Sequence, residues 1–498
     1  MLPMDWCDVN VFLINPPYLK MFSRQQRSPA VIKSGTLYYP YWLSFAAGAL
    51  KKAGFNVLLV DAVASDLNMT QCVAKAEGFS PCLAVVETST PSIANDLEFC
   101  RVLKDKLPGL VVAIVGTHPS ACYEEVLKAC RSVDIVAIAE YEATILDIAK
   151  RLAAGKDWRD VLGIAYRSGE KTVKTSARPF IENLDELPFV SKVYKEFLPI
   201  KRYYFSLARH PMVMLITGRG CPNGCFFCVY PQTMHGHGYR FRSPENVLEE
   251  LKFIKSEMPE VKEVVFEDDT FTADEDRVVK ICQLMRQAGI RMNWFANVRV
   301  NTRQETLREM KLAGFRQCAV GFESGDQSIL DAMGKGIKVE QSLAFKKHCD
   351  ELGILVHGCF MVGFPGETKA SMERTLAFAK RLNCDSAQFY PVFPYPGTKA
   401  HDWVSRQHYL KTTDHSKWLD SKGRHECVYD LPDASSEDMQ TFCDSAYTRY
   451  HLSPRYILKK MTQSILSPRE AGRNMTAGFN FIRSRFVAAA EHGRGRVS

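Results

Sequence analysis

Two series of short apolar runs, in which helix-length amphipathic stretches separate each run from the next, constrain the fold of this chain most strongly. The first series comprises VNVFLIN, NVLLVD, LAVVE, VVAIV and VDIVAIAE, and it ends at residue 140. Such alternation is typical of βαβ units, in which helices cover both faces of a parallel sheet. Residues 1–150 are therefore predicted to form a doubly wound, Rossmann-like α/β domain. Ligands of such sheets bind at the carboxyl ends of the strands, here residues 15–18, 88–93 and 116–120.

The second series begins with MVMLIT at residue 212 and ends with SAQFYPVF at residue 393. Between them lie VKEVVFEDD, RMNWFANV, QCAVGFES and LVHGCFMVGF, so six strands are predicted in a βα rhythm. This rhythm indicates a full or partial TIM-type β/α barrel over residues 206–405, with its chemistry at the carboxyl ends of the strands. Residues 151–205 are predicted to form a hairpin and a proline-containing linker, and residues 406–498 a helical C-terminal region.

Composition and charge exclude several classes of protein. A hydrophobic share of 46% with 24% charged residues is that of an ordinary folded protein and excludes disorder. The net charge of +8 is small for 498 residues, so nucleic acid is not expected as a partner. The N-terminus shows no signal-peptide pattern, and no apolar run reaches the roughly 18–20 residues that cross a bilayer. A cytoplasmic location is therefore expected.

The end of the sequence is basic. Residues 455–498 contain nine Lys and Arg but only two Glu, and apolar residues are interleaved with them. An amphipathic basic helix of this kind can lie on an anionic membrane surface, so peripheral membrane contact at the inner face is one hypothesis. The alternative is a helix that packs on its own barrel and exposes its basic side to solvent.

Three cysteines, Cys221, Cys225 and Cys228, lie within eight residues in the stretch GRGCPNGCFFCVYPQ, which follows the first strand of the second series. The other thirteen cysteines are scattered singly. Three thiolates could bind a structural zinc ion if His235 or His237 supplied the fourth ligand. They could also hold a four-iron cluster and leave one iron open to an exogenous ligand. The spacing, three residues and then two, places the thiolates on a tight loop that can hold three corners of a cubic cluster.

The pattern Cys-x₃-Cys-x-Phe-Cys resembles the signature of the radical S-adenosylmethionine superfamily. This resemblance implies that Cys221, Cys225 and Cys228 hold a [4Fe–4S] cluster whose open iron binds the amine and carboxylate of S-adenosylmethionine. Reduction of the cluster, by a partner such as flavodoxin or ferredoxin, would cleave the sulfonium to a 5′-deoxyadenosyl radical. The cofactor would carry out the difficult chemistry, and the barrel would orient it and exclude water.

The same resemblance implies contacts of four residues with S-adenosylmethionine. Phe227 matches the aromatic position beside the adenine, although it could also be an ordinary core residue. Asp268 and Asp269, in FEDDTFT, match the place where the methionyl amine is held, although acids at a strand end can also cap a helix. Gly363, in GCFMVGFPGE, matches the segment whose backbone lies against the adenine, and a glycine permits such close approach.

Three further residues are candidates for cofactor contacts. Glu323 and Ser324, in GFESGDQ, match the region that contacts the ribose or the methionyl group, against the alternative of a solvated turn. Arg299, in NVRVN, could face a carboxylate with its planar guanidinium, or form a surface ion pair. The residues that perform general acid or base catalysis remain unassigned.

A doubly wound domain before this barrel resembles the cobalamin-binding class of the superfamily, as do the segments INPPY, YYPYWLSFAAGALKKAGFNVLLVDA and VGTHPSACYEEVL. Cobalamin is therefore implied as a further cofactor. The sequence departs from the class because it contains no Asp-x-His-x-x-Gly motif. Either cobalamin binds without a protein ligand to cobalt, or the domain has kept the fold without the cofactor. His118 is a candidate contact.

Within this class the chain most resembles the radical enzymes of hopanoid lipid biosynthesis, through segments such as RPFIENLDELPFV, YPQTMHGHGYRFRS and PYPGT. That resemblance implies a bulky, lipid-linked substrate and a rearrangement of a side-chain sugar to a cyclitol ether. A cobalamin-dependent methyltransferase or an oxidative cyclase is the alternative within the superfamily. A non-catalytic iron–sulfur binding or sensor protein is the alternative from another class.

Overall fold

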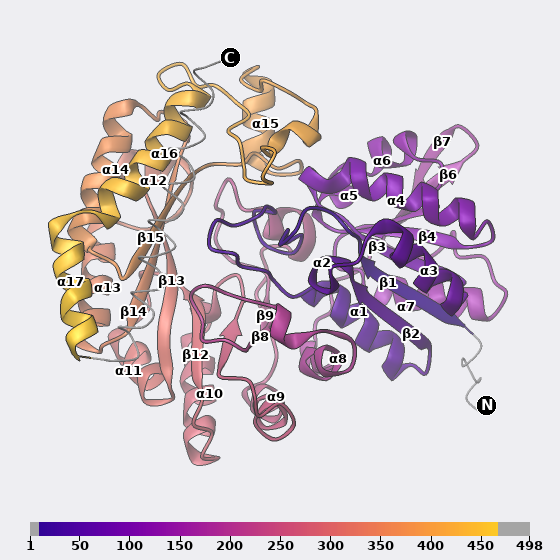
Figure 1. The fold of residues 1–498 in the computed structure, drawn as a ribbon, viewed down its shortest axis with the longest axis horizontal. Coiled ribbons are helices and arrows are strands. Elements are labelled where there is room, and N and C mark those ends of the chain that lie inside the picture. Colours follow the sequence, from indigo (N-terminus) through magenta and orange to yellow (C-terminus); the bar gives the residue numbers. More distant parts are fainter. Residues whose placement is uncertain (1–8, 467–498) are drawn as a thin grey trace.

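The computed structural model describes residues 9–466, in which two α/β units lie side by side (Figure 1). The first unit contains a seven-stranded sheet with the strand order β2-β1-β3-β4-β5-β6-β7. The first five strands in this order are parallel, and β6 and β7 are antiparallel. The strands are β1 (Asn10–Asn15), β2 (Asn56–Asp61), β3 (Leu83–Glu87), β4 (Val111–Val115), β5 (Ile135–Ala137), β6 (Ile164–Ser168) and β7 (Lys171–Lys174).

Helices cover both faces of this sheet, as expected for a doubly wound domain. They are α1 (Tyr41–Lys52), α2 (Ala62–Ser65), α3 (Met69–Phe79), α4 (Ile93–Lys106), α5 (Thr117–Ala121), α6 (Tyr123–Ala129) and α7 (Glu142–Ala153). One hydrophobic cluster includes residues of α3, α4 and α6. The other includes residues of α1 and α7 and continues into the barrel, so the two units share one core.

The segment predicted as a hairpin and linker contains β6 and β7. Because β6 pairs with β5, the hairpin belongs to the first sheet, which therefore extends beyond residue 150. The chain then passes through α8 (Val190–Phe197) to the barrel. Tyr194, on α8, donates a hydrogen bond to the Met214 carbonyl oxygen at 3.1 Å, which attaches this connector to the first barrel strand.

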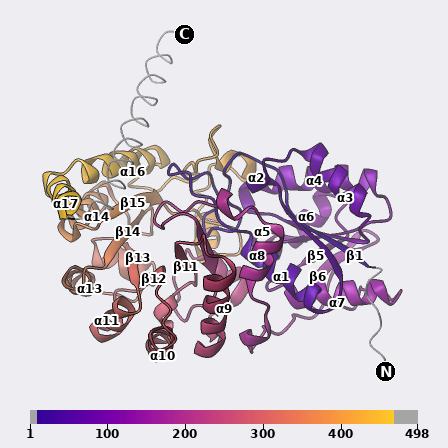
Figure 2. The same cartoon turned by 60° about the horizontal axis from the view of Figure 1, so that its bottom comes forward.

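The second unit is an open barrel of six parallel strands, in the order β8-β11-β12-β13-β14-β15. Each strand coincides with one of the six predicted apolar runs, and the predicted fold class is confirmed. Neighbouring helices line the outside of the strands (Figure 2). The strands are β8 (Met212–Leu215), β11 (Glu263–Phe266), β12 (Asn293–Val298), β13 (Phe315–Glu323), β14 (Leu355–Val362) and β15 (Ser386–Pro391). The helices are α9 (Pro244–Glu257), α10 (Glu275–Gln287), α11 (Gln304–Leu312), α12 (Gln327–Ala332), α13 (Val339–Glu351) and α14 (Lys369–Leu382).

The C-terminal region combines helices with a mostly irregular segment, residues 407–435, so the prediction of a helical region holds only in part, and its last helices cover the open edge of the barrel. It contains α15 (Lys399–Arg406), α16 (Ser436–His451) and α17 (Pro454–Leu466). Tyr450 donates a hydrogen bond to the Cys384 carbonyl oxygen at 2.8 Å, and Lys459 pairs with Asp385 at 3.1 Å. These contacts protect β15, which would otherwise be an exposed strand edge.

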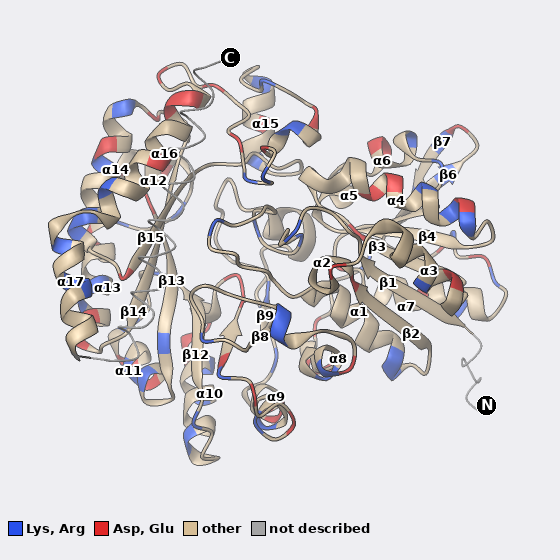
Figure 3. Cartoon of the chain, in the orientation of Figure 1, with Lys and Arg blue, Asp and Glu red and all other residues tan. Residues whose placement is uncertain are grey.

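The hypothesis of membrane contact concerns residues 455–498, of which those after residue 466 lie outside the described residues. Within α17, Lys459 binds the barrel, which fits the alternative of a helix packed on its own domain. Acidic and basic residues are interspersed along the outer helices (Figure 3). Between residues 9 and 466, no helix combines the length and the apolar character that crossing a membrane requires.

A buried acid at the carboxyl end of the first sheet makes the stability of the fold depend on pH. Burial raises the pKa of Glu87, the last residue of β3, to about 8, against the opposing effects of Gln25 and Arg24. The folded protein therefore keeps a proton that the unfolded chain loses above its ordinary pKa of 4.5. This stabilising contribution is complete below that ordinary pKa and is lost as the pH rises to 8.

We expect the free energy of unfolding to decrease between pH 5 and pH 8, with a contribution from Glu87 of up to about 1.4 kcal/mol per pH unit. The variant Glu87→Gln should remove this part of the slope, because its amide does not titrate. Urea unfolding of both proteins at several pH values measures the difference. Equal slopes would contradict the assignment.

Candidate cluster and cofactor site

The three cysteines lie on a loop at the carboxyl end of β8, between two short antiparallel strands, β9 (Gly218–Arg219) and β10 (Arg240–Phe241). Gly220 starts the loop with a φ of +80°, and a Cβ atom there would lie 2.1 Å from the Gly238 carbonyl oxygen, so the turn requires glycine. Cys221 is buried, and Cys225 and Cys228 are half-buried.

The three thiols are close enough to influence one another. Burial raises the pKa of the Cys228 thiol, and Asp269, Cys225 and Cys221 raise it further. The Asn223 side-chain amide donates a hydrogen bond to Cys221 Sγ at 3.2 Å. All three cysteines are free thiols. A partly accessible set of three thiols fits a cluster that leaves one iron open.

The zinc interpretation lacks a fourth ligand in the described structure. Between residues 9 and 466, no three His, Cys, Asp or Glu side chains converge closely enough to hold a metal ion. His235 Nδ1 lies 3.1 Å from Glu140 Oε1, and His237 Nδ1 lies 3.1 Å from the carbonyl oxygens of Cys221 and Asn223. In a cluster each thiolate binds a different iron, so the thiols need not converge on one point, whereas a single zinc ion requires four convergent ligands.

Buried ion pairs attach both stems of the cysteine loop to the first domain. Arg240 Nη2 donates to Glu140 Oε1 at 2.6 Å, and Arg219 Nη2 donates to Glu142 Oε1 at 2.6 Å. Glu140 Oε1 also lies 3.7 Å from Arg219 Nη1. Although burial alone would raise the pKa of Glu140, Arg219, His235 and Arg240 hold it well below the ordinary value. The loop is therefore positioned by a domain that precedes it in the sequence.

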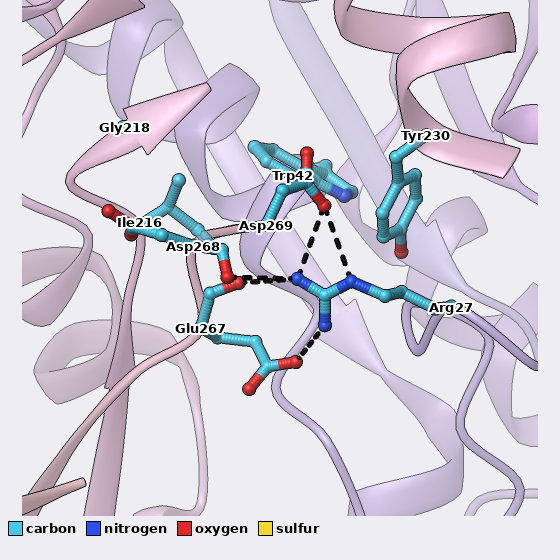
Figure 4. A pocket seen from close by; sticks show the side chains of 8 residues that line it. All are labelled: Arg27, Trp42, Ile216, Gly218, Tyr230, Glu267, Asp268 and Asp269. Atoms are coloured by element: carbon cyan, nitrogen blue, oxygen red, sulfur yellow. Dashed lines mark hydrogen bonds and ion pairs between the residues drawn. The ribbon is translucent and has the colours of Figure 1, made fainter. Parts of the chain in front are cut away.

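The two predicted aspartates differ in their surroundings (Figure 4). Asp268 is buried, and its carboxylate accepts hydrogen bonds from the backbone N–H and the hydroxyl of Thr217 at 2.6 and 2.7 Å. Asp268 thus ties the end of β8 to the end of β11, and both its oxygens are engaged. Asp269 instead faces Arg27, from the loop after β1, with Nη2 to Oδ1 at 3.2 Å. Glu267, which sequence reasoning missed, pairs with the same guanidinium at 2.5 Å.

A second charged group lies beside Cys225. Lys335 Nζ donates to Glu323 Oε1 at 2.7 Å, and Arg299 Nη2 donates to the Lys335 carbonyl oxygen at 2.7 Å. Burial acts to lower the pKa of Lys335. The negative charges of Glu323 and Cys225 outweigh this effect, so the pKa of Lys335 is raised above its ordinary value. Sequence reasoning also missed Lys335. The one sequence feature that could have indicated this residue is its place between two glycines in MGKGIK. Ser324, by contrast, is fully buried, and its hydroxyl lies 3.0 Å from that of Thr375.

The predicted adenine contacts lie against other parts of the chain. The ring of Phe227 packs edge-on against Phe364, with 5.6 Å between ring centroids. Gly363 has a φ of +100°, and Tyr429 donates a hydrogen bond to its carbonyl oxygen at 2.7 Å. A Cβ atom at Gly363 would lie 2.2 Å from the Tyr429 hydroxyl. The glycine therefore permits the C-terminal region to approach β14, and its contact with adenine stays a prediction.

Among residues 9–466, several buried polar atoms at the carboxyl edge of the first sheet and at its contact with the barrel have no hydrogen-bond partner. They include Tyr141 OH and Arg219 Nε. Buried polar atoms in native proteins normally have partners, so this edge suits an amide-bearing ligand such as cobalamin. His118 is buried, with Nδ1 3.2 Å from the Thr90 hydroxyl and its ring edge-on to that of His415. Burial lowers its pKa to about 3, so it is neutral.

Comparison with known proteins agrees with this division of the chain. The profile of the Radical SAM superfamily matches residues 215–379, and that of the B12 binding domain matches residues 27–149. An uncharacterized methyltransferase, PH0819, of Pyrococcus horikoshii is 30% identical over 426 residues, which cover 85% of this chain and 90% of that protein.

Two further proteins are similar. The anaerobic magnesium-protoporphyrin IX monomethyl ester cyclase of Rubrivivax gelatinosus is 27% identical over 368 residues, 72% of this chain and 64% of the cyclase. The radical S-adenosylmethionine methyltransferase TsrM from Kitasatospora setae, solved with tryptophan and a SAM analogue bound, has the same fold. The two structures align with a TM-score of 0.68 at 15% sequence identity, and the alignment covers 89% of each chain.

Fold and cysteine loop together define an α/β enzyme in which a B12-binding domain precedes a radical SAM barrel. The chain belongs to the radical S-adenosylmethionine superfamily, in the class that carries this N-terminal domain. The predictions of the superfamily, the class and an enzymatic activity are confirmed. Its cofactors are a [4Fe–4S] cluster and S-adenosylmethionine, and the B12-binding domain supports cobalamin as a third. The alternative of a non-catalytic sensor is set aside.

The ion pairs of Glu140 lead to a prediction about the cysteine loop. The variant Glu140→Gln should lower the free energy of unfolding by about 1.5–3 kcal/mol, because it removes the anionic partner of Arg240, whereas the buried Arg219 keeps Glu142. It should also lower the iron content below four per chain, since the loop stems lose their anchor. Urea unfolding and iron analysis of anaerobically purified protein measure both effects.

A matched control is Glu373→Gln, which breaks the exposed bidentate pair of Glu373 with Arg449. This change should cost less than about 1 kcal/mol and leave iron binding intact. If Glu140→Gln behaved like this control, the anchoring of the cysteine loop by the first domain would be disproved.

Proposed function

We propose that this enzyme is a cobalamin-dependent radical S-adenosylmethionine methyltransferase that acts on a small-molecule substrate. The observation that carries the proposal is that the carboxyl edges of the two sheets meet. Arg27, after β1, contacts the end of β11, and Glu140, after β5, contacts the stems of the cysteine loop. A group bound at the first edge would therefore lie close to the cysteines. The methyltransferase relatives support the choice of reaction.

In this proposal the residues of the chain bind the cluster and S-adenosylmethionine and orient them. When bound, the cluster supplies an electron to S-adenosylmethionine and cobalamin carries a methyl group. Cys221, Cys225 and Cys228 bind three irons through their thiolates. Asp269 holds the methionyl ammonium, and Lys335 provides a positive charge for the methionyl carboxylate beside Cys225. These contacts orient the sulfonium, which reacts only in a fixed geometry.

The remaining predicted residues take supporting positions. Phe227 supplies an apolar surface for the adenine. Glu323 keeps Lys335 charged through their ion pair, and Arg299 orients the Lys335 backbone. The fixed contacts of Asp268 with Thr217 and of Ser324 with Thr375 support structural roles for these two residues.

A cyclase is the second candidate, because the similarity to an anaerobic cyclase covers 72% of this chain. The rearrangement of a hopanoid side-chain sugar, which sequence resemblance implied, is not supported. Methyl transfer and oxidative ring closure, the alternatives within the superfamily, agree better with the relatives. A lipid-linked substrate and flavodoxin or ferredoxin as the reductant remain proposals.

Product analysis separates these reactions. We expect anaerobically reconstituted protein to contain four irons and one cobalt. With a reductant and S-adenosylmethionine, it should form both 5′-deoxyadenosine and S-adenosylhomocysteine, the second only when cobalamin is present. 5′-Deoxyadenosine alone would favour the cyclase, and the absence of both products would refute the proposed function.

The role of the cysteines is tested by Cys225→Ala, which removes one ligand. Product formation should fall by at least about 100-fold, because loss of a ligand costs more than the 10- to 100-fold typical of groups around a metal site. Iron content and the absorbance of the cluster should fall with it. Cys82→Ala, at another half-buried free thiol, is the control and should keep both.

A further inference from the structure

Arg27 brings a positive charge from the first domain to the mouth of the barrel (Figure 4). It belongs to the loop that connects β1 with α1, more than 230 residues before the carboxylates that it binds. Its side chain is 31% exposed, whereas that of Arg24, in the same loop, is fully buried in a salt bridge with Asp96. Arg27 is therefore within reach of a ligand that enters the mouth.

The guanidinium makes hydrogen bonds to three consecutive residues at the end of β11. Nη1 donates to Glu267 Oε1 at 2.5 Å, and Nη2 donates to the carbonyl oxygens of Glu267 and Asp268 at 3.1 and 3.0 Å. Nε and Nη2 both donate to Asp269 Oδ1, at 3.3 and 3.2 Å. Because one planar guanidinium makes all of these bonds, it fixes the positions of both carboxylates relative to each other. A lysine has no such fork of donors and could not reproduce this geometry.

Two carboxylate oxygens of this group make no hydrogen bond in the described part of the chain: Glu267 Oε2, which is buried, and Asp269 Oδ2, on the less buried residue. Glu267 is 3% exposed, and Arg27 is its one ion-pair partner among residues 9–466. Two carboxylates and one guanidinium leave a net charge of −1, which suits a single ammonium group.

This group of charges lies next to the cysteine loop. Arg27 Cζ lies 5.9 Å from the ring centroid of Tyr230, which is two residues after Cys228. The three charged residues line a narrow crevice together with Trp42, Tyr230 and Gly218.

We propose that Arg27 is a positioning residue for S-adenosylmethionine: it neutralises Glu267 and holds Asp269 by Oδ1, so that Asp269 Oδ2 accepts the methionyl ammonium. This inference rests on the proposed function, because it takes Asp269 as the ammonium site. It makes binding of the cosubstrate in the barrel depend on a residue of the B12-binding domain. Glu267 then acts as a counter-charge that keeps Arg27 from fully neutralising Asp269.

The net charge of Arg27, Glu267 and Asp269 predicts how tightly each variant binds S-adenosylmethionine. In Glu267→Gln, Arg27 is balanced by Asp269 alone, so the net charge becomes zero and S-adenosylmethionine should bind about tenfold more weakly or worse. In the double variant Arg27→Ala with Glu267→Gln, Asp269 again carries an unopposed negative charge. Its affinity should exceed that of Glu267→Gln but stay at least about threefold below the wild type, because the charge is restored while Asp269 is no longer oriented by Arg27.

Isothermal titration calorimetry of the anaerobically reconstituted proteins measures these affinities without turnover. Each protein is titrated with S-adenosylmethionine and with an analogue in which hydrogen replaces the α-amine. Iron content is measured for every variant, and Arg449→Ala, at an exposed ion pair, is the control. The analogue should bind Glu267→Gln and wild type with equal affinity, because it lacks the group that the charges recognise.

Three results would overturn the inference: wild-type affinity in Glu267→Gln, no recovery in the double variant, or an equal loss of affinity for the analogue. Arg27→Lys keeps the charge but loses the fork of donors, so it should bind S-adenosylmethionine about three- to tenfold more weakly. Unchanged affinity in that variant would refute the orienting role. If the wild type bound no S-adenosylmethionine, the proposed function itself would fail, which is a distinguishable outcome.

Discussion

The buried ion pairs of Glu140 and Glu142 with Arg219 and Arg240 are the contacts on which the arrangement of the site depends. A charge buried away from water is stable only when a partner compensates it, so these residues can be accommodated only when the two domains meet in one relative position. The arginines form the stems of the cysteine loop, and the glutamates begin α7 or precede it. The position of the three thiols is therefore set jointly by both domains.

The shared core explains why the first domain cannot be treated as a separate module. One hydrophobic cluster runs from α1 and α7 into the barrel, and Arg27 and Glu140 cross the same boundary with charged contacts. The carboxyl edges of the two sheets consequently face each other. In an enzyme of this class, that geometry allows a ligand of the B12-binding domain and the cluster of the barrel to serve one substrate.

Several site residues show where sequence reasoning succeeds and where it stops. The cysteine spacing and the FEDD segment are local patterns, and both lie at the site. The roles within FEDD could not be assigned from the sequence, because Thr217 and Arg27, which distinguish Asp268 from Asp269, are about 50 and 240 residues away. Lys335 was missed for a similar reason, since its importance depends on Glu323 and Cys225.

The sequence by itself determined the two βα series, the order of the domains and the three-thiol loop, because hydrophobic periodicity and ligand spacing are properties of neighbouring residues. Only the tertiary structure decided that the predicted hairpin completes the first sheet and that C-terminal helices cover β15. It also decided which acids face a cation and which are tied to the backbone. Such pairings depend on distances between segments remote in the chain, and these distances exist only after the two domains have packed together.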